Sequence, residues 1–230
     1  NIKYGVERAR LPTGKAICLI TEDGERTFAT YLGASLELSK EDIIEEDIEV
    51  SKIVHLTGYQ LEDPVLRDTA LHAIEIAKNL GKKISIDVAD PGLVERNKAD
   101  ILDILKDYAD IIFANDDEGF ALIGKRDKEA AEELSKLAKV IFLKKGEEGS
   151  IASIDGNIIR IDPFPVKSVD TTGAGDMYAA CLLYGLTHDM KIEDMGKIAS
   201  YAASLVVAQN GARIDIDLKE EVEKKFNISL

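Results

Sequence analysis

Short apolar runs alternate with longer amphipathic segments through the middle of the chain, and this alternation restricts the fold more than any other feature. The short runs are typical of buried β-strands and the longer segments of α-helices. In chain order they cover residues 52–56, 64–80, 83–87, 91–106, 111–114 and 140–143. Because strands separated by helices pair in parallel through right-handed crossovers, helices cover both faces of the sheet. We therefore predict a three-layer α/β fold with a mostly parallel sheet.

Polar side chains stand where three of the predicted strands end: Asp87, Asn115 and Lys144. Ligands of open α/β sheets bind beyond the carboxyl ends of the strands, so these residues are candidates for a site. For Asp87 two interpretations stay open, a structural acid and an acid that acts through water on a magnesium ion. Asp90 directly precedes Pro91 and is expected to cap a helix.

Residues 170–176 read Asp-Thr-Thr-Gly-Ala-Gly-Asp and lead directly into an apolar helix over residues 177–186. At a helix start the first N–H groups have no intrahelical partner, and together with the helix dipole they stabilise negative charge. Glycines let such a backbone approach a phosphate closely. We therefore expect an anion hole formed by the backbone of Thr172, Gly173, Ala174 and Gly175.

Asp176 closes this segment and is the candidate general base. A carboxylate repels a phosphate, so it adds nothing to a simple phosphate site. It suits an enzyme that must deprotonate an attacking hydroxyl group. The alternative interpretation is structural, because an acid near a helix start often caps the helix and glycines often form tight turns.

The same seven residues resemble the C-terminal signature of the PfkB family of carbohydrate and nucleoside kinases, which have the ribokinase-like fold. Three further segments resemble family segments in the expected order, at residues 115–118, 141–150 and 202–212. The resemblance implies an enzyme that transfers the γ-phosphoryl group of ATP to a hydroxyl group of a sugar or nucleoside. It also implies that ATP and Mg²⁺ are required.

The resemblance assigns cation sites to four residues. Asn115 and Glu118 match an Asn-x-x-Glu motif that organises Mg²⁺ through its waters, although taken alone the pair is typical of an ordinary N-cap. Asp170 and Thr172 are expected to help build a K⁺ site, together with backbone near residues 208 and 211.

The resemblance assigns contacts with the nucleotide to residues from three segments: Asn115, Lys144, Gly146, Gly149, Ala203 and Asn210. Gly146 is expected to allow close approach of the backbone to ATP. Small residues around Ala203 would let a flat base pack against a helix. For Lys144 a contact with the phosphates and a solvated position at the strand end are equally compatible with the sequence.

Residues 14–35 are predicted to form part of a β-lid, and residues 36–230 the α/β nucleotide-binding and catalytic core. Strand-like residues 15–21 and 26–32 flank turn residues 22–25, which is typical of a hairpin. In the family such strands cover the sugar site, and we expect a homodimer through the lid. The lid sequence is similar to adenosine kinase-like members and other sugar kinases, which favours a ribose-containing substrate such as adenosine. Tyr31 could stack on this substrate, although packing is the commoner role of a strand aromatic.

The resemblance begins partway into the family pattern. We therefore expect a segment with further strands to precede the chain, and its absence to expose an apolar sheet edge. Two other functions stay open: a nucleotide-binding fragment or regulatory module without catalysis, and an oxidoreductase. The oxidoreductase is the weaker, because a Gly-x-Gly-x-x-Gly motif after a first strand is missing.

The amino-acid composition indicates which binding partners and which cellular compartment to expect. The 230 residues carry a net charge of −14, which argues against nucleic-acid and anionic-membrane partners. A small-molecule substrate agrees with this charge. The two cysteines, Cys18 and Cys181, lie far apart and form no metal motif, so we expect a cytoplasmic protein without structural zinc. No apolar run approaches the roughly 18 residues needed to span a bilayer.

Overall fold

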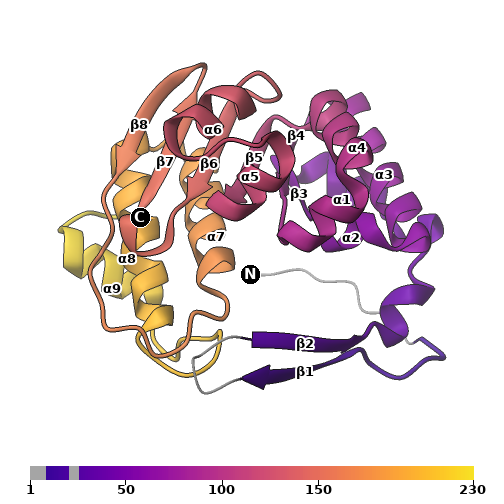
Figure 1. The fold of residues 1–230 in the computed structure, drawn as a ribbon, viewed down its shortest axis with the longest axis horizontal. Helices are drawn as coiled ribbons and strands as arrows, with labels where there is room; N and C mark the ends of the chain where they lie inside the picture. The colour runs from indigo at the N-terminus through magenta and orange to yellow at the C-terminus, as the bar shows by residue number, and fades with distance from the viewer. Residues whose placement is uncertain (1–8, 21–25) are drawn as a thin grey trace.

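A computed structural model describes residues 9–20 and 26–230. Its main sheet has six strands in the order β3-β4-β5-β6-β7-β8 (Figure 1). Neighbouring strands from β3 to β6 pair in parallel, whereas β7 pairs antiparallel with both β6 and β8. The strands are β3 Ile53–Thr57, β4 Lys83–Asp87, β5 Ile111–Asn115, β6 Val140–Lys144, β7 Ser150–Ile154 and β8 Asn157–Ile161. The predicted mostly parallel sheet is therefore confirmed.

The sheet ends in an antiparallel hairpin of β7 and β8, and β8 is a strand that the sequence analysis did not predict. Asp155 and Gly156 join the two strands, with φ angles of 48° and 82°. Two residues with positive φ make the type of turn whose twist matches a tight hairpin, and Asp-Gly is a preferred sequence for it. The Asp-Gly pair was therefore a usable signal for a further strand.

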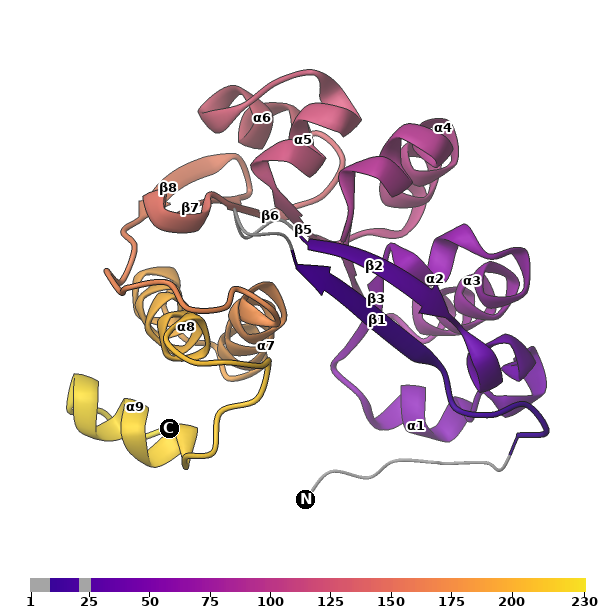
Figure 2. The ribbon, with the colours of Figure 1, turned by 60° about the horizontal axis from the view of Figure 1, so that its bottom comes forward.

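Helices cover both faces of the sheet, which confirms the three layers (Figures 1 and 2). Alternate residues of β5 show the division, since Ile112 packs into one apolar core and Phe113 into the other. The first core includes α1 Glu45–Val50, α2 Tyr59–Glu62, α3 Pro64–Asn79, α4 Pro91–Tyr108, α5 Asp116–Ile123 and α6 Asp127–Leu134. The second includes α7 Ala174–Thr187 and α8 Ile192–Val207, and α9 Leu218–Phe226 packs outside α8.

Two aspartates start long helices on the first face. The side chain of Asp63 accepts hydrogen bonds from the N–H groups of Val65 and Leu66, at 2.9 and 3.3 Å. That of Asp90 accepts one from Leu93 at 2.7 Å. Each aspartate satisfies N–H groups that the first helical turn leaves without an intrahelical partner. The predicted cap at Asp90 is confirmed.

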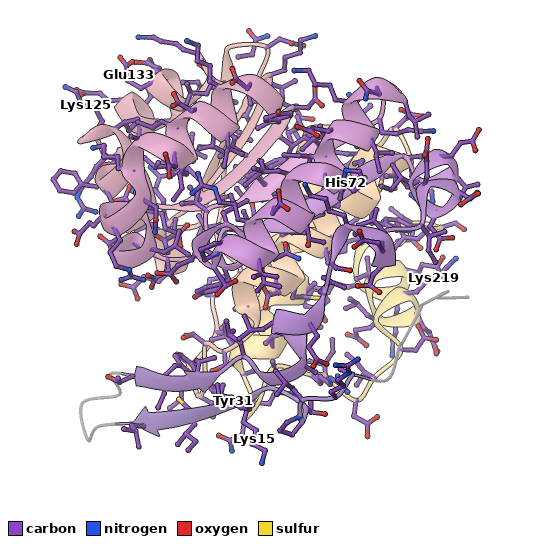
Figure 3. All side chains as sticks on the ribbon, turned by 90° about the vertical axis from the view of Figure 1, so that its right-hand side faces the viewer. Lys15, Tyr31, His72, Lys125, Glu133 and Lys219 are labelled. Carbon is purple, nitrogen blue, oxygen red and sulfur yellow. The ribbon has the colours of Figure 1, made fainter. Side chains whose placement is uncertain are left out.

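The hairpin that the sequence predicts as part of a lid forms a separate two-stranded sheet from β1 Lys15–Ile20 and β2 Arg26–Tyr31. The predicted turn at residues 22–25 lies outside the described residues. Figure 3 shows Lys15 and Tyr31 on this hairpin, which projects from the body of the chain. Tyr31 is 47% exposed, so it does not pack into a core of the described residues.

Short 3-10 turns, η1 Gly33–Glu37 and η2 Lys40–Asp42, connect the lid to the core. Gly33 has a φ of +55°, and a side chain there would collide with the carbonyl of Pro12. The base of the lid is therefore tightly packed.

In the part of the chain that the structure describes, no helix is both long and apolar enough to cross a membrane. Cys18 and Cys181 are free thiols.

Candidate active site

The start of α7 is built around Gly173. This residue has a φ of +80°, and a Cβ atom there would lie 2.5 Å from the Cβ of Ala212. Both the backbone conformation and the close approach of residue 212 therefore require glycine. The helix begins at Ala174, so Gly175 and Asp176 lie in its first turn. The structure thus places the predicted anion hole and the predicted base together at one helix N-terminus.

The four donors predicted for the anion hole are not equivalent. The N–H group of Thr172 donates to Asp170 Oδ1 at 2.9 Å, and that of Ala174 donates to the carbonyl of Thr171 at 3.2 Å. An anion bound here would compete with these internal acceptors. Of the four predicted donors, only Ala174 and Gly175 belong to the first turn of α7, where N–H groups have no intrahelical partner.

Asp170 connects this loop to the turn after α8. Its Oδ2 accepts a hydrogen bond from the N–H group of Gly211 at 2.9 Å, while Oδ1 binds Thr172. The structure therefore brings together Asp170, Thr172 and the backbone near residue 211, as the predicted K⁺ site requires. Both carboxylate oxygens nevertheless already accept N–H groups.

Asn115 and Glu118 form a reciprocal capping box at the start of α5. The N–H group of Asn115 donates to Glu118 Oε2 at 2.7 Å, and its amide Nδ2 donates to Oε1 at 2.6 Å. The N–H group of Glu118 in turn donates to Asn115 Oδ1 at 2.8 Å. The capping interpretation is therefore observed.

Glu118 is buried, with only 2% of its surface exposed. Burial raises the pKa of its carboxyl group to about 7, while the charge of Lys144 and the N–H group of Asn115 act in the opposite direction. The negative charges of Asp87 and Asp90 raise this pKa further. Acids from β4, the β4–α4 loop and α5 therefore converge at the carboxyl edge of the sheet.

Lys144 links this acidic edge to α7. Its Nζ lies 2.7 Å from Asp87 Oδ2, and the side chains of Lys144 and Asp87 are only 18% and 8% exposed. A Cβ atom at Gly175 would lie 3.5 Å from the same Nζ. The interpretation of Lys144 as a solvated lysine at the strand end is therefore wrong, because Asp87 draws the ammonium group inward.

A cavity of about 650 Å³ opens beside this helix start. The predicted nucleotide contacts Lys144, Gly146, Gly149 and Ala203 all line it, as do Ala174 and Gly175. The other two predicted contacts, Asn115 and Asn210, are not among its lining residues, and Asn210 is exposed. Gly146 has a φ of +56° and open space around it, which leaves its backbone accessible.

Gly149 has an additional structural reason to be glycine. Its φ is +86°, and a side chain there would collide with the carbonyl of Ile161. It therefore lets the β6–β7 connection pass close to the end of β8. At the back of the cavity Ser150 and Tyr178 share a hydrogen bond. Their hydroxyl groups are thus partnered within the protein.

Sequence reasoning missed Tyr59, which follows β3 at the carboxyl edge and is 58% exposed. Partial desolvation of its phenol raises the pKa of Tyr59, and the negative charges of Asp90, Glu118 and Asp176 act in the same direction. Gly58 allows this position, because a side chain there would collide with the carbonyl of Val88. A Gly-Tyr pair directly after a predicted strand was the available signal.

Known proteins with similar sequences and structures are sugar and nucleoside kinases. A 5-dehydro-2-deoxygluconokinase from Clostridium beijerinckii is 33% identical over 201 residues, which are 82% of this chain and 59% of that protein. An adenosine kinase structure from Sinorhizobium meliloti has a TM-score of 0.88 and 33% identity, covering 93% of this chain and 66% of that one. A ribokinase structure from Thermotoga maritima has a TM-score of 0.76 and 26% identity, with 96% and 72% covered.

The chain thus spans 59% of the length of its curated clostridial relative. The model of the pfkB family carbohydrate kinases matches residues 1–219, nearly the whole chain. This match includes the start of α7, the capping box of α5 and the β6–β7 connection. The chain belongs to the PfkB family of carbohydrate kinases.

Proposed function

We propose that the protein transfers the γ-phosphoryl group of ATP to a hydroxyl group of a sugar or nucleoside. One observation carries this proposal: the glycine-started helix α7 borders a cavity of nucleotide size, with an acid in its first turn and Lys144 beside it. Donors and a cation at one end of a cavity suit a triphosphate. An exposed acid beside them suits the proton transfer that a hydroxyl acceptor requires.

In the proposed reaction Asp176 accepts the proton of the attacking hydroxyl. N–H groups among residues 172–175 stabilise the charge that develops on the transferred phosphoryl group. The ammonium group of Lys144 contributes a compensating positive charge. ATP would lie along the cavity, with its base near Ala203 and its phosphates near Gly175, and would pass Gly146 and Gly149.

Magnesium would be held mainly by the phosphates. In the described part of the chain no group of three acid, histidine or cysteine side chains could hold a metal ion. This fits Mg²⁺, which retains several waters and takes few protein ligands. Glu118 and Asn115 would orient those waters. Bound Mg²⁺ supplies shielding of the phosphate charges during transfer.

The K⁺ site remains part of the proposal. Asp170, Thr172 and the backbone near residue 211 would surround the ion beside the anion hole. Because Asp170 already accepts two N–H groups, we expect K⁺ to use carbonyl oxygens as well. Titration of K⁺ at constant ionic strength, with Na⁺ as the control ion, tests this site through the ATP affinity.

The lid would close over the acceptor and pair with a second copy of the chain. In Figure 1 the hairpin lies below the sheet, on the side where α2 follows β3. Ile17, Leu19 and Phe28 are each more than half exposed, and a two-stranded hairpin alone is marginally stable in water. Tyr31 is exposed enough to contact a bound sugar or base. Sedimentation of the natural protein and of Leu19→Asp would test the homodimer.

The acceptor can be identified by a phosphorylation screen of the intact natural protein. ATP, Mg²⁺ and one acceptor at a time are combined, with adenosine, ribose, fructose and 5-dehydro-2-deoxygluconate as the first set. Asp176→Asn, purified in parallel, controls for contaminating kinases. Phosphorylation of at least one acceptor by the natural protein alone supports the proposal. Binding of ATP without turnover of any acceptor would instead favour a non-catalytic nucleotide-binding or regulatory module.

A further inference from the structure

Asp87 occupies a central position at the carboxyl edge of the sheet. It ends β4, and only 5% of its surface is exposed. Its Oδ2 pairs with Lys144 Nζ at 2.7 Å, and its Oδ1 accepts the N–H group of Ala89 at 3.3 Å. Its backbone carbonyl accepts the N–H group of Gly58 at 2.7 Å. One residue thus contacts the end of β6, its own following loop and the β3–α2 turn.

Among these contacts, the ion pair with Lys144 matters most for the site, because it fixes the position of the ammonium group. A lysine carries its charge on a flexible four-carbon stem, which has no preferred direction without a partner. Here the ammonium group is held inward, 3.5 Å from the position that a Cβ of Gly175 would take. Because both side chains are mostly buried, each charge compensates the burial of the other.

We propose that Asp87 is a positioning residue that holds Lys144 against the first turn of α7. This inference rests on the proposed function, in which Lys144 meets the phosphates of ATP. Asp87 itself touches neither ATP nor the acceptor. Without its carboxylate the site becomes more positive by one charge, but the ammonium group loses its fixed place. Because ordering a free lysine side chain on binding costs roughly 2- to 10-fold in affinity, the loss of position is expected to dominate.

A structural role of Asp87 must be separated from this positioning role. Ala89 has a φ of +76°, which is rare for a residue with a side chain, and Asp87 binds its N–H group. Asp87→Asn is nearly isosteric and keeps an oxygen for this hydrogen bond. Asp90→Asn is the matched control, because it removes an equal charge three residues further along the chain and asparagine caps helices as well as aspartate.

The decisive experiment is a double-mutant cycle on ATP affinity with Asp87→Asn, Lys144→Met and the double variant. We expect Asp87→Asn to weaken ATP binding by up to roughly 10-fold. In the Lys144→Met background the same change should have almost no further effect, since the group that it positions is gone. Asp90→Asn should leave the affinity unchanged. Thermal unfolding of each variant identifies any loss of the fold.

A second readout needs neither ATP nor activity. Amine-labelling of Lys144, followed by peptide mass spectrometry, should be slow in the natural protein and at least severalfold faster in Asp87→Asn, but not in Asp90→Asn. If the natural protein binds no ATP, the proposed function fails while this labelling still tests the ion pair. Unchanged labelling, unchanged ATP affinity of a folded Asp87→Asn, or additive effects in the double variant would overturn the inference.

Discussion

Two helices that start at the same edge of the sheet, α5 and α7, satisfy their first turns in opposite ways. At α5 the side chains of Asn115 and Glu118 bind each other's backbone N–H groups, which closes the helix start. At α7 the cap is Gly173, and its helix start has no side-chain cap among the described residues. A helix start that its own side chains complete is rigid and self-sufficient. One that begins at glycine leaves room for an external anion.

Asp176→Asn should have the largest effect, because it removes the proposed base from the open helix start without changing its shape. We expect kcat to fall by roughly 10²- to 10⁴-fold while ATP affinity changes little. Steady-state kinetics with the acceptor found in the screen, together with calorimetric ATP titration, measures both quantities. Turnover at the natural rate would remove Asp176 from the role of base.

Glu118→Gln tests the closed helix start. Burial raises the pKa of Glu118 from 4.5 to about 7 in the folded protein. The folded state therefore binds this proton more tightly than the unfolded state does. The resulting stability is fully present below pH 4.5 and is lost as the pH rises through 7.

Relative to Glu118→Gln, the natural protein should consequently lose up to roughly 3 kcal/mol of unfolding free energy across this interval. Urea unfolding of both proteins at several pH values, without metal ions, measures the difference. A constant difference at all pH values would contradict the raised pKa. With Mg²⁺ present, the variant should also need more Mg²⁺ for ATP binding.

Gly173→Ala tests whether the open helix start depends on glycine. Alanine at a φ of +80° is strained, and its Cβ would meet Ala212 at 2.5 Å. We expect a loss of roughly 1–3 kcal/mol of stability and weaker ATP binding. Gly124→Ala, at the end of α5 with open space around it, is the control for conformation alone. Equal effects of both variants on ATP binding would show that the site does not depend on Gly173.

Asp63→Ala should have the smallest effect on stability and ATP affinity. It shows what the loss of an ordinary helix cap costs, for comparison with the changes at α5 and α7. Asp63 caps α3 through two N–H groups. Its loss should cost about 1 kcal/mol of stability and leave ATP affinity unchanged. Chemical unfolding and ATP titration measure the two quantities. A change in ATP affinity would mean that α3 is coupled to the site.

The sequence predicted the three layers well, because alternating strands and helices permit few arrangements. It also predicted the cap at Asp90, which depends on neighbouring residues alone. It left open the state of Lys144 and Asp87, since the two are 57 positions apart and only the pairing of β4, β5 and β6 brings them together. The hydrogen bond from the Thr172 N–H group to Asp170 could not be predicted either, because it depends on the conformation of the loop.

The bridge made by Asp170 has a consequence for how a nucleotide would enter and leave. It fastens the loop before α7 to the turn after α8, so these two walls of the cavity are expected to move as one. Pro165, Val166 and Ser168, which come before this bridge in the chain, are exposed and form a rim of the same cavity. We therefore expect the exchange of ADP for ATP to be gated by this rim. In hydrogen exchange, the amides of the rim should slow when nucleotide binds, whereas that of Gly211 should be slow throughout.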